Sequence, residues 1–291
     1  MNAKKVLLVG CGDIGVPLGL LLRDLGAEVW GLRRNPAVLP KEIQAIKGDV
    51  TNLESLNNVR KVSFDYVVVT LTPADFSDEA YQKVYVQGLK NLLALLAQKQ
   101  FSGHLLFISS TSVYHQSDGS WVDENSPVAP TSFSGRRLLE AEQVLEASAI
   151  ASTVVRFAGI YGPGRRRLIE QVLAGSGCTK QPALYTNRIH RDDCVGFLAH
   201  LVVRHCDGGV LDKRYIGVDN KPATLWSVKR WLAAQLGVNA DAMECLQQTR
   251  RASKRCSNQR MLSSGYQLLH PDYQSGYKKL VQNEFRNGLS L

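Results

Sequence analysis

The strongest constraint on the fold is a glycine-rich stretch, GCGDIG at 10–15. It follows an apolar run at 5–10 and precedes an amphipathic helical pattern. Gly10 allows a tight turn, Gly12 lets a pyrophosphate approach the backbone, and Gly15 lets the helix pack closely on the strand. Amide groups at a helix N-terminus attract phosphate, so the stretch predicts a dinucleotide-binding loop. The loop residues expected to contact the cofactor are Gly10, Gly12, Asp13, Ile14 and Gly15.

Short apolar runs alternate with helical patterns over the first part of the chain. The runs lie at 5–10, 27–32, 66–71, 104–110 and 152–159, with a weaker one at 43–49. Their hydrophobicity is continuous, which is typical of strands buried on both faces. The alternation predicts an α/β fold, a doubly wound parallel sheet of the Rossmann type.

The alternation stops after about residue 160. A loop signal, YGPGRRR, is followed by an irregular stretch at 175–184, and a helical pattern covers 225–237. We therefore expect 1–160 to form the dinucleotide-binding domain and 161–291 to form mainly a smaller C-terminal substrate lobe. This division allows some segments of 161–291 to belong to the dinucleotide-binding domain.

The end of the second predicted strand bears on the choice of cofactor. An NAD site usually carries Asp or Glu there, whereas this chain has Arg33 and Arg34, which suit a 2′-phosphate. NADP is therefore favoured, with NAD as the alternative cofactor. The structural alternative is that both residues are surface arginines on a loop. Asp49 is expected to accept a hydrogen bond from the adenine amino group, and Val50 and Leu71 are also assigned to the cofactor site.

Charge and hydropathy exclude several classes of protein. The net charge is +9, with basic clusters at 164–168 and 250–255. No nucleic-acid-binding motif accompanies them, so a solvated basic face or a phosphorylated small molecule explains them better than nucleic acid. No apolar run approaches the roughly 20 residues of a membrane span, and no signal peptide is recognised. A cytoplasmic location is expected.

Cysteine and histidine spacing does not predict a metal site. The six cysteines contain no Cys-x-x-Cys pair, which indicates reduced thiols rather than a disulfide framework. Cys194, His200, His205 and Cys206 lie close in sequence, but on a helix His200 would point away from Cys194 and His205.

Several motifs together resemble the extended short-chain dehydrogenase/reductase family, the NAD-dependent epimerase/dehydratase group. They are VGCGDIG, KGDVTN, FISSTSVY, RFAGIYGPG and RIHRDD, between residues 9 and 193, and KRCSNQRMLSSGYQLLHPDY resembles the family's C-termini. The resemblance implies a bound dinucleotide and a C-terminal substrate lobe. It also implies that Ser110 holds a substrate hydroxyl or carbonyl, with Thr111 beside it.

The chain departs from the family pattern where Tyr-x-x-x-Lys is expected. Ser132 with Arg136, or Phe133 with Arg137, occupies these positions, and Val9 replaces one loop glycine. Serine is too weak an acid for the tyrosine's role, phenylalanine carries no exchangeable proton, and arginine does not relay protons.

Other groups are then needed for proton transfer. Tyr114 is the first candidate proton donor, followed by Tyr161 and His190. Arg136 is assigned the role of stabilising an anion. The alternative for the segment is structural, with Ser132 or Ser134 capping a helix.

Two functional hypotheses follow. The first is an NAD(P)-dependent oxidoreductase or epimerase/dehydratase-like enzyme, NADP preferred, acting on a small hydroxyl or carbonyl compound such as a nucleotide sugar. Arg165 and Arg166, with Arg167, would hold an anionic group of this substrate. The second is a non-catalytic NADP-binding redox sensor or regulatory protein. In both, we expect a small-molecule partner, no nucleic acid and no membrane, and homo-oligomer formation is left open.

Overall fold

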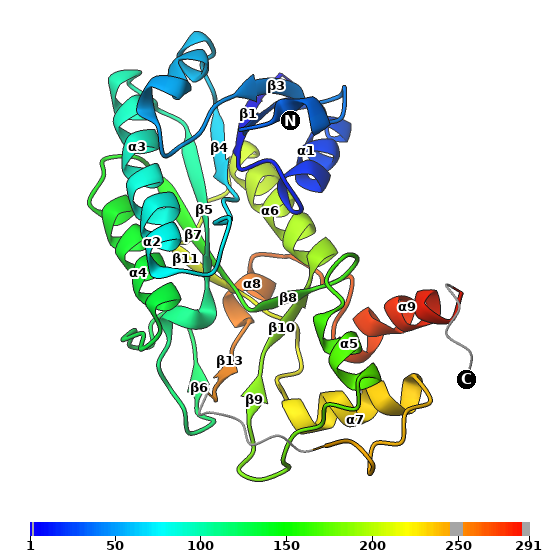
Figure 1. The fold of residues 1–291 in the computed structure, drawn as a ribbon. Helices are drawn as coiled ribbons and strands as arrows, with labels where there is room; N and C mark the ends of the chain where they lie inside the picture. The colour runs from blue at the N-terminus through cyan, green and yellow to red at the C-terminus, as the bar shows by residue number, and fades with distance from the viewer. Residues whose placement is uncertain (2, 245–252, 287–291) are drawn as a thin grey trace. The chain divides into compact units, whose positions relative to one another are not determined.

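The computed structural model of the chain describes residue 1, residues 3–244 and residues 253–286 (Figure 1). Cys245 and the residues 250–252 of the basic cluster lie outside this part. The chain divides into two compact units and passes between them several times. The first unit comprises Met1–Val113, Val128–Arg156 and Val195–Tyr215; the second comprises Tyr114–Pro127, Phe157–Cys194 and Ile216–Leu291.

A seven-stranded sheet has the order β11-β7-β5-β4-β1-β2-β3. The strands are β1 (Lys5–Val9), β2 (Glu28–Arg33), β3 (Gln44–Lys47), β4 (Tyr66–Val69), β5 (His104–Ser110), β7 (Ser152–Phe157) and β11 (Arg214–Gly217). Strand β1 pairs in parallel with β2 and β4, so that Leu7 lies opposite both Trp30 and Val67. The chain thus changes direction across the sheet between β1 and β4, which is the place where doubly wound folds bind ligands.

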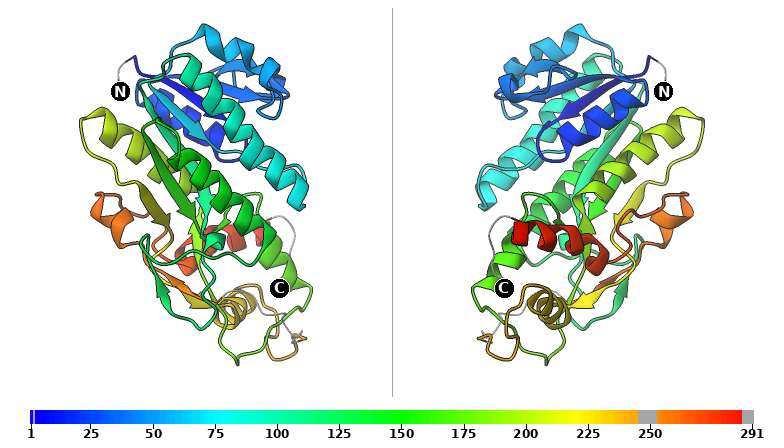
Figure 2. Two further views of the ribbon diagram at one scale, coloured as in Figure 1. Left: turned by 90° about the vertical axis from the view of Figure 1, so that its left-hand side faces the viewer. Right: turned by 90° about the vertical axis from the view of Figure 1, so that its right-hand side faces the viewer.

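Helices cover both faces of this sheet. The helices of the first unit are α1 (Gly15–Asp24), α2 (Asp78–Tyr81), α3 (Gly88–Gln98), α4 (Phe133–Glu146) and most of α6 (Arg191–Cys206). Figures 1 and 2 show α2, α3 and α4 on one face and α1 and α6 on the other. Because both faces are covered, β1 and β4 are buried along nearly their whole length. The predicted Rossmann-type sheet is confirmed, and all six predicted runs form its strands.

The first unit buries a charged network beneath α4. Glu142, 3% exposed, accepts hydrogen bonds from the Arg156 guanidinium, with a shortest N–O distance of 2.6 Å. The Ser109 hydroxyl donates to the same carboxylate at 2.5 Å. Two strands, β5 and β7, are therefore joined to α4 through a single carboxyl group.

The second unit is built from short strand pairs and helices. Its strands are β6 (Trp121–Val122), β8 (Gly159–Tyr161), β9 (Tyr185–Thr186), β10 (Arg188–His190), β12 (Ala223–Thr224) and β13 (Arg255–Cys256). Its helices are α5 (Arg167–Leu173), α7 (Leu225–Gln235), α8 (Gln259–Ser263) and α9 (Tyr273–Arg286). A core that includes Ile169, Leu232 and Tyr277 joins α5, α7 and α9. No helix within the described residues is long and apolar enough to cross a membrane.

The buried carboxylate gives a first testable prediction. Replacing Glu142 with Gln should lower the free energy of unfolding by about 3 kcal/mol, because Arg156 keeps its buried charge without a counter-charge. Urea unfolding followed by circular dichroism measures the change. The matched control is Glu146→Gln, one turn along α4, whose carboxylate pairs with Arg214 and is 54% exposed; it should cost less than about 1 kcal/mol. Equal losses in the two variants would contradict this account.

Candidate functional site

The glycine loop lies between the carboxyl end of β1 and the start of α1. Gly10 has a φ of +89°, and a Cβ atom there would lie 3.0 Å from the backbone of Leu71. The Thr70 hydroxyl donates to the Gly10 carbonyl at 2.7 Å. The turn therefore needs glycine for its conformation and for its close approach to the chain that leaves β4.

Gly12 and Gly15 have different structural roles in the glycine loop. A Cβ on Gly15 would lie 3.1 Å from the Thr70 hydroxyl, so this glycine lets α1 pack on the sheet. A Cβ on Gly12 would meet only the Gly10 carbonyl oxygen, at 3.9 Å, and would otherwise fill open space. The first turn of α1 contains no acidic residue. An open backbone followed by a helix N-terminus fits a pyrophosphate, so these residues suit a dinucleotide.

Two arginines, Arg33 and Arg34, lie at the end of β2. Arg33 donates from Nη1 to the Cys11 carbonyl at 3.1 Å, which holds its guanidinium beside the glycine loop. Arg34 is exposed. No acidic side chain occupies the end of this strand, where one would bind the ribose hydroxyls.

The other residues assigned to the cofactor also belong to the first unit. Asp49 accepts hydrogen bonds from the backbone and hydroxyl of Thr51 through one carboxylate oxygen. Val50 is buried, and Leu71 accepts a hydrogen bond from the Tyr85 hydroxyl at 3.2 Å. These contacts give Asp49 and Leu71 local structural partners; their contact with a cofactor stays a prediction.

Ser110 ends β5 at the carboxyl edge of the sheet. Its hydroxyl oxygen accepts a hydrogen bond from the Ser112 backbone at 3.1 Å, and the side chain is half-buried. Accepting a bond leaves the hydroxyl proton able to donate to a substrate oxygen. Thr111 beside it is buried. The neighbouring Ser109 points instead to the buried carboxylate of Glu142, so the two consecutive serines serve different purposes.

Tyr114, the first candidate proton donor, is 1% exposed and belongs to the second unit. Its hydroxyl donates to the Asp123 carbonyl at 2.8 Å, and its own carbonyl accepts from the Lys254 ammonium. The first bond holds the 114–127 segment together, and the second joins this segment to Lys254. Tyr114 would have to leave the Asp123 carbonyl before it could donate to a substrate.

The start of α4 holds the positions of the expected Tyr-x-x-x-Lys pair. Ser132 caps the helix, because its hydroxyl accepts from the Gly135 backbone at 3.2 Å. Arg136 is exposed and donates to the Thr131 carbonyl. Phe133 packs against Phe76, with ring centroids 4.8 Å apart.

Arg137 forms a two-pronged ion pair across to α2. It contacts both carboxylate oxygens of Asp78, at 2.7 and 3.0 Å, and also reaches Glu140. In either alignment, the side chains at the two expected positions make structural contacts. That these positions have lost the catalytic pair stays a prediction.

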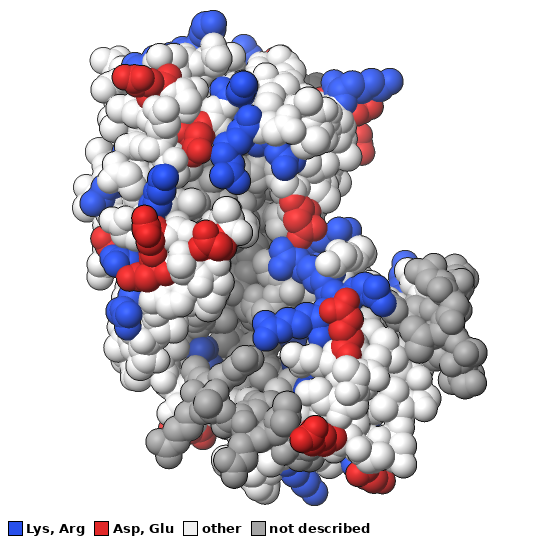
Figure 3. Space-filling view, viewed as in Figure 1, with Lys and Arg blue, Asp and Glu red and all other residues white. Residues whose placement is uncertain are grey.

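The second unit contains a cavity of about 920 Å³ beside α5. The basic residues that line it are Arg165, Arg166, Arg167, Arg188 and Lys229. Of the described residues around it, Glu170 is the acidic one. Figure 3 shows Lys and Arg side chains gathered over the segment that leads into α5. Such a lining favours a negatively charged ligand.

The sequence patterns do not predict two of these cavity cations. Arg188, in β10, is 8% exposed, and Lys229, in α7, is 3% exposed. The Lys229 ammonium donates to the carbonyls of Ser176 and Gly177, at 2.7 and 3.1 Å. Nothing in the helical pattern at 225–237 separates this lysine from a solvated one, so the fold was needed to find it.

Asp219 is a buried acidic residue of this unit. It is 2% exposed and accepts from the Lys221 backbone through Oδ1. Among the described residues, its Oδ2 has no hydrogen-bond partner. Burial raises the pKa of this carboxyl to about 7, although the charge of Arg188 opposes the shift.

The fold and the glycine loop together are typical of dinucleotide-binding proteins of the short-chain dehydrogenase/reductase type. Residues 6–193 match the model of the NAD dependent epimerase/dehydratase family, and the chain belongs to this family. The dinucleotide expected in the glycine loop is therefore a nicotinamide cofactor.

Particular relatives support the assignment. The chain is 37% identical to an NAD-dependent epimerase/dehydratase structure from Methylobacillus flagellatus, with a TM-score of 0.82 over 98% of this chain and 100% of the other. It is 30% identical to protein YeeZ of Escherichia coli K12 over 210 residues, 68% of this chain and 73% of that protein. It is 32% identical over 146 residues to the sterol-4-alpha-carboxylate 3-dehydrogenase ERG26 of Candida albicans, but this match spans 47% of the chain and 41% of the dehydrogenase.

The raised pKa of Asp219 predicts a pH dependence of stability. In the unfolded chain the carboxyl has a pKa of about 3.9, so the folded state binds more protons between about pH 4 and 7. The stability tied to this group is complete below pH 4 and is lost as the pH rises to 7. Asp219→Asn should therefore match wild type near pH 4 and exceed it by roughly 1–3 kcal/mol at pH 8. Urea unfolding across this range measures the difference.

The control is Asp241→Asn in the same unit, where the carboxylate is 80% exposed. Its difference from wild type should not grow over the same pH range. If the Asp219→Asn difference is equally flat, burial does not shift this carboxyl.

Proposed function

We propose that the protein is an NADP-dependent oxidoreductase or epimerase acting on a small hydroxyl or carbonyl compound that carries a phosphate or another anionic group. The observation that carries the proposal is the cavity beside α5, with five cationic side chains among its lining residues. A protein that only senses a dinucleotide needs no cationic pocket in addition to its dinucleotide site. Nucleotide sugars, which combine a carbonyl-forming hydroxyl with a pyrophosphate, are the first substrates to test.

Ser110 is the residue assigned to the reacting oxygen. When bound, the nicotinamide supplies or accepts the hydride. The Ser110 hydroxyl then donates a hydrogen bond to the substrate oxygen on which charge develops. Arg136 is assigned to anion stabilisation, since guanidinium does not exchange protons at neutral pH. Because the Tyr114 hydroxyl is held by the Asp123 carbonyl, water supplies the proton when a carbonyl is reduced and accepts the proton when a hydroxyl is oxidised, and we expect slow turnover.

A redox sensor without turnover is the second candidate. The contacts at the start of α4 favour it, because Ser132 caps the helix and Arg137 is paired with Asp78 and Glu140. The same glycine loop and arginines would serve a sensor equally well.

The exposed Arg34 predicts the cofactor preference. Arg34→Ala should weaken NADPH binding about tenfold, the loss of roughly 1.4 kcal/mol from one charge-assisted contact to the 2′-phosphate. NADH binding should stay unchanged. Titration calorimetry with both dinucleotides measures this, and Lys41→Ala, which removes another exposed charge, is the control. Equal weakening of both dinucleotides, or a wild type that prefers NADH, would count against NADP.

Turnover tests the role of Ser110. Oxidation of NADPH is followed by absorbance with 4-keto sugar nucleotides and small phosphorylated carbonyls. Oxidation of nucleotide sugars and hydroxyl compounds is followed as reduction of NADP. Ser110→Ala should lower kcat about a hundredfold on an active substrate, as the loss of one oxyanion donor does. Ser112→Ala, two residues on, should leave kcat within about threefold of wild type. NADPH binding without turnover on any compound would favour the sensor.

A further inference from the structure

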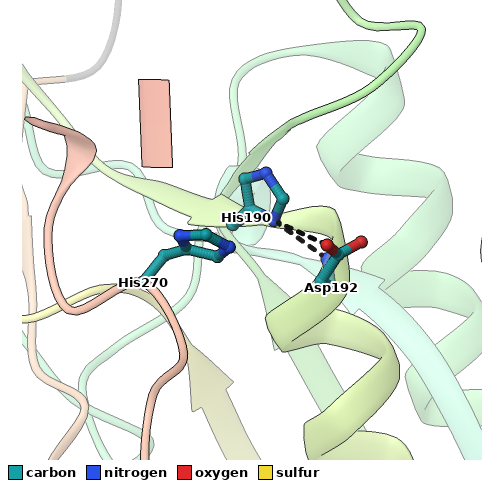
Figure 4. Close-up of side chains that lie close together, drawn as sticks. All are labelled: His190, Asp192 and His270. Carbon is teal, nitrogen blue, oxygen red and sulfur yellow. Dashed lines mark hydrogen bonds and ion pairs between the residues drawn. The ribbon is translucent and has the colours of Figure 1, made fainter. Parts of the chain in front are cut away.

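Two histidines and an aspartate come together in the second unit. His190 ends β10, Asp192 lies in the first turn of α6, and His270 lies in the loop before α9 (Figure 4). One donor atom from each of the three lies within 4.8 Å of the other two. The Nδ1 atom of His190 is 3.7 Å from Oδ2 of Asp192, and the two imidazole centroids are 3.9 Å apart.

The loop that carries His270 is held in place by a neighbouring carboxylate. Asp193, fully buried, accepts from the backbones of Leu269 and His270, at 2.7 and 3.0 Å. It also accepts from the Tyr266 hydroxyl at 3.0 Å. Since Asp192 and Asp193 are adjacent in α6, the residue after the first carboxylate fixes the backbone that presents His270. The three groups are therefore brought together before any ligand arrives.

The burial and pairing of these groups suit a metal ion. The His190 side chain is 4% exposed. Its Nδ1 accepts from the Asp192 backbone at 3.2 Å, so this lone pair carries no proton and faces the carboxylate. Arg191 pairs with Oδ1 of Asp192, whereas Oδ2 is the oxygen nearer His190.

We propose that His190, Asp192 and His270 bind one divalent transition-metal ion, with zinc the best match. Two imidazoles and one carboxylate are ordinary zinc ligands, and water would complete a tetrahedral shell. Coordination would replace the hydrogen bond between the Asp192 backbone and Nδ1. It would need a contraction of the cluster, because ligands of one zinc ion lie about 2.0–2.2 Å from the metal.

The bound ion would connect this cluster to the wall of the cationic cavity. The Tyr161 ring meets His190 edge-on, with centroids 5.3 Å apart, and stacks on Tyr277 at 4.3 Å. Both tyrosines line the cavity. Zinc therefore stabilises the cavity wall by joining β10 and α6 to the loop before α9.

Cobalt(II) chloride added to the full-length, metal-free protein tests the site, because its visible absorption reports both binding and ligand type. Wild type should bind one cobalt per chain, and zinc should displace it. His270→Ala and Asp192→Asn should each weaken binding about tenfold or more, since each removes one of three protein ligands. His115→Ala, an exposed histidine in the same unit, should bind as wild type does. Zinc should also raise the thermal midpoint of wild type but not of His270→Ala.

Several outcomes would overturn the proposal. One is the absence of cobalt or zinc binding by wild type, and another is unchanged binding in both ligand variants. A cobalt–thiolate charge-transfer band would place the metal on cysteine instead. Far-ultraviolet circular dichroism shows that each variant is folded; if His270→Ala is not folded, Asp192→Asn, which keeps the shape of the side chain, decides the question.

Discussion

The contact between the glycine loop and the end of β4 is the constraint on which the first unit depends. The chain turns at Gly10 with a positive φ, a conformation that favours glycine. Gly10 also lies against the Leu71 backbone, with no room for a side chain. Thr70 holds the Gly10 carbonyl and also limits the space at Gly15, so a single hydroxyl governs both the turn and the start of α1. A larger residue at Gly10 would separate β1 from β4 at the point where the sheet changes direction.

Local patterns were enough to predict the fold. Strands buried on both faces must be continuously apolar, and that requirement produced the six runs that became strands of the sheet. Strand β11 was not predicted, because four residues between polar segments give too short a signal. Arg156 shows that a strand can also hold a buried charge. A charged residue inside a strand with both faces covered needs a buried counter-charge, and Glu142 supplies it.

The candidate site was only partly predictable for a physical reason. The glycine loop is contiguous in sequence, so its function is visible in six residues. Arg165, Arg166 and Arg167 are adjacent in sequence, whereas Arg188, Lys229 and the His190 cluster are brought together from segments far apart in the chain. Lys229 comes from a helix with an ordinary amphipathic pattern, and His270 comes from a loop whose position depends on Asp193. Such convergence leaves no local pattern, because burial and orientation are decided by packing.

The buried position of Lys229 has a consequence for molecular selectivity. Its side chain is 3% exposed and its ammonium donates to two backbone carbonyls, so it acts on a ligand mainly through its electric field. A field of this kind draws in any anion and does not distinguish a phosphate from a carboxylate. Discrimination then falls to Arg165, Arg166 and Arg167, whose planar guanidinium groups match the spacing of paired oxygens. Evolution could therefore retune the preferred anion by changing the exposed arginines, while the buried lysine keeps the pocket attractive to negative charge.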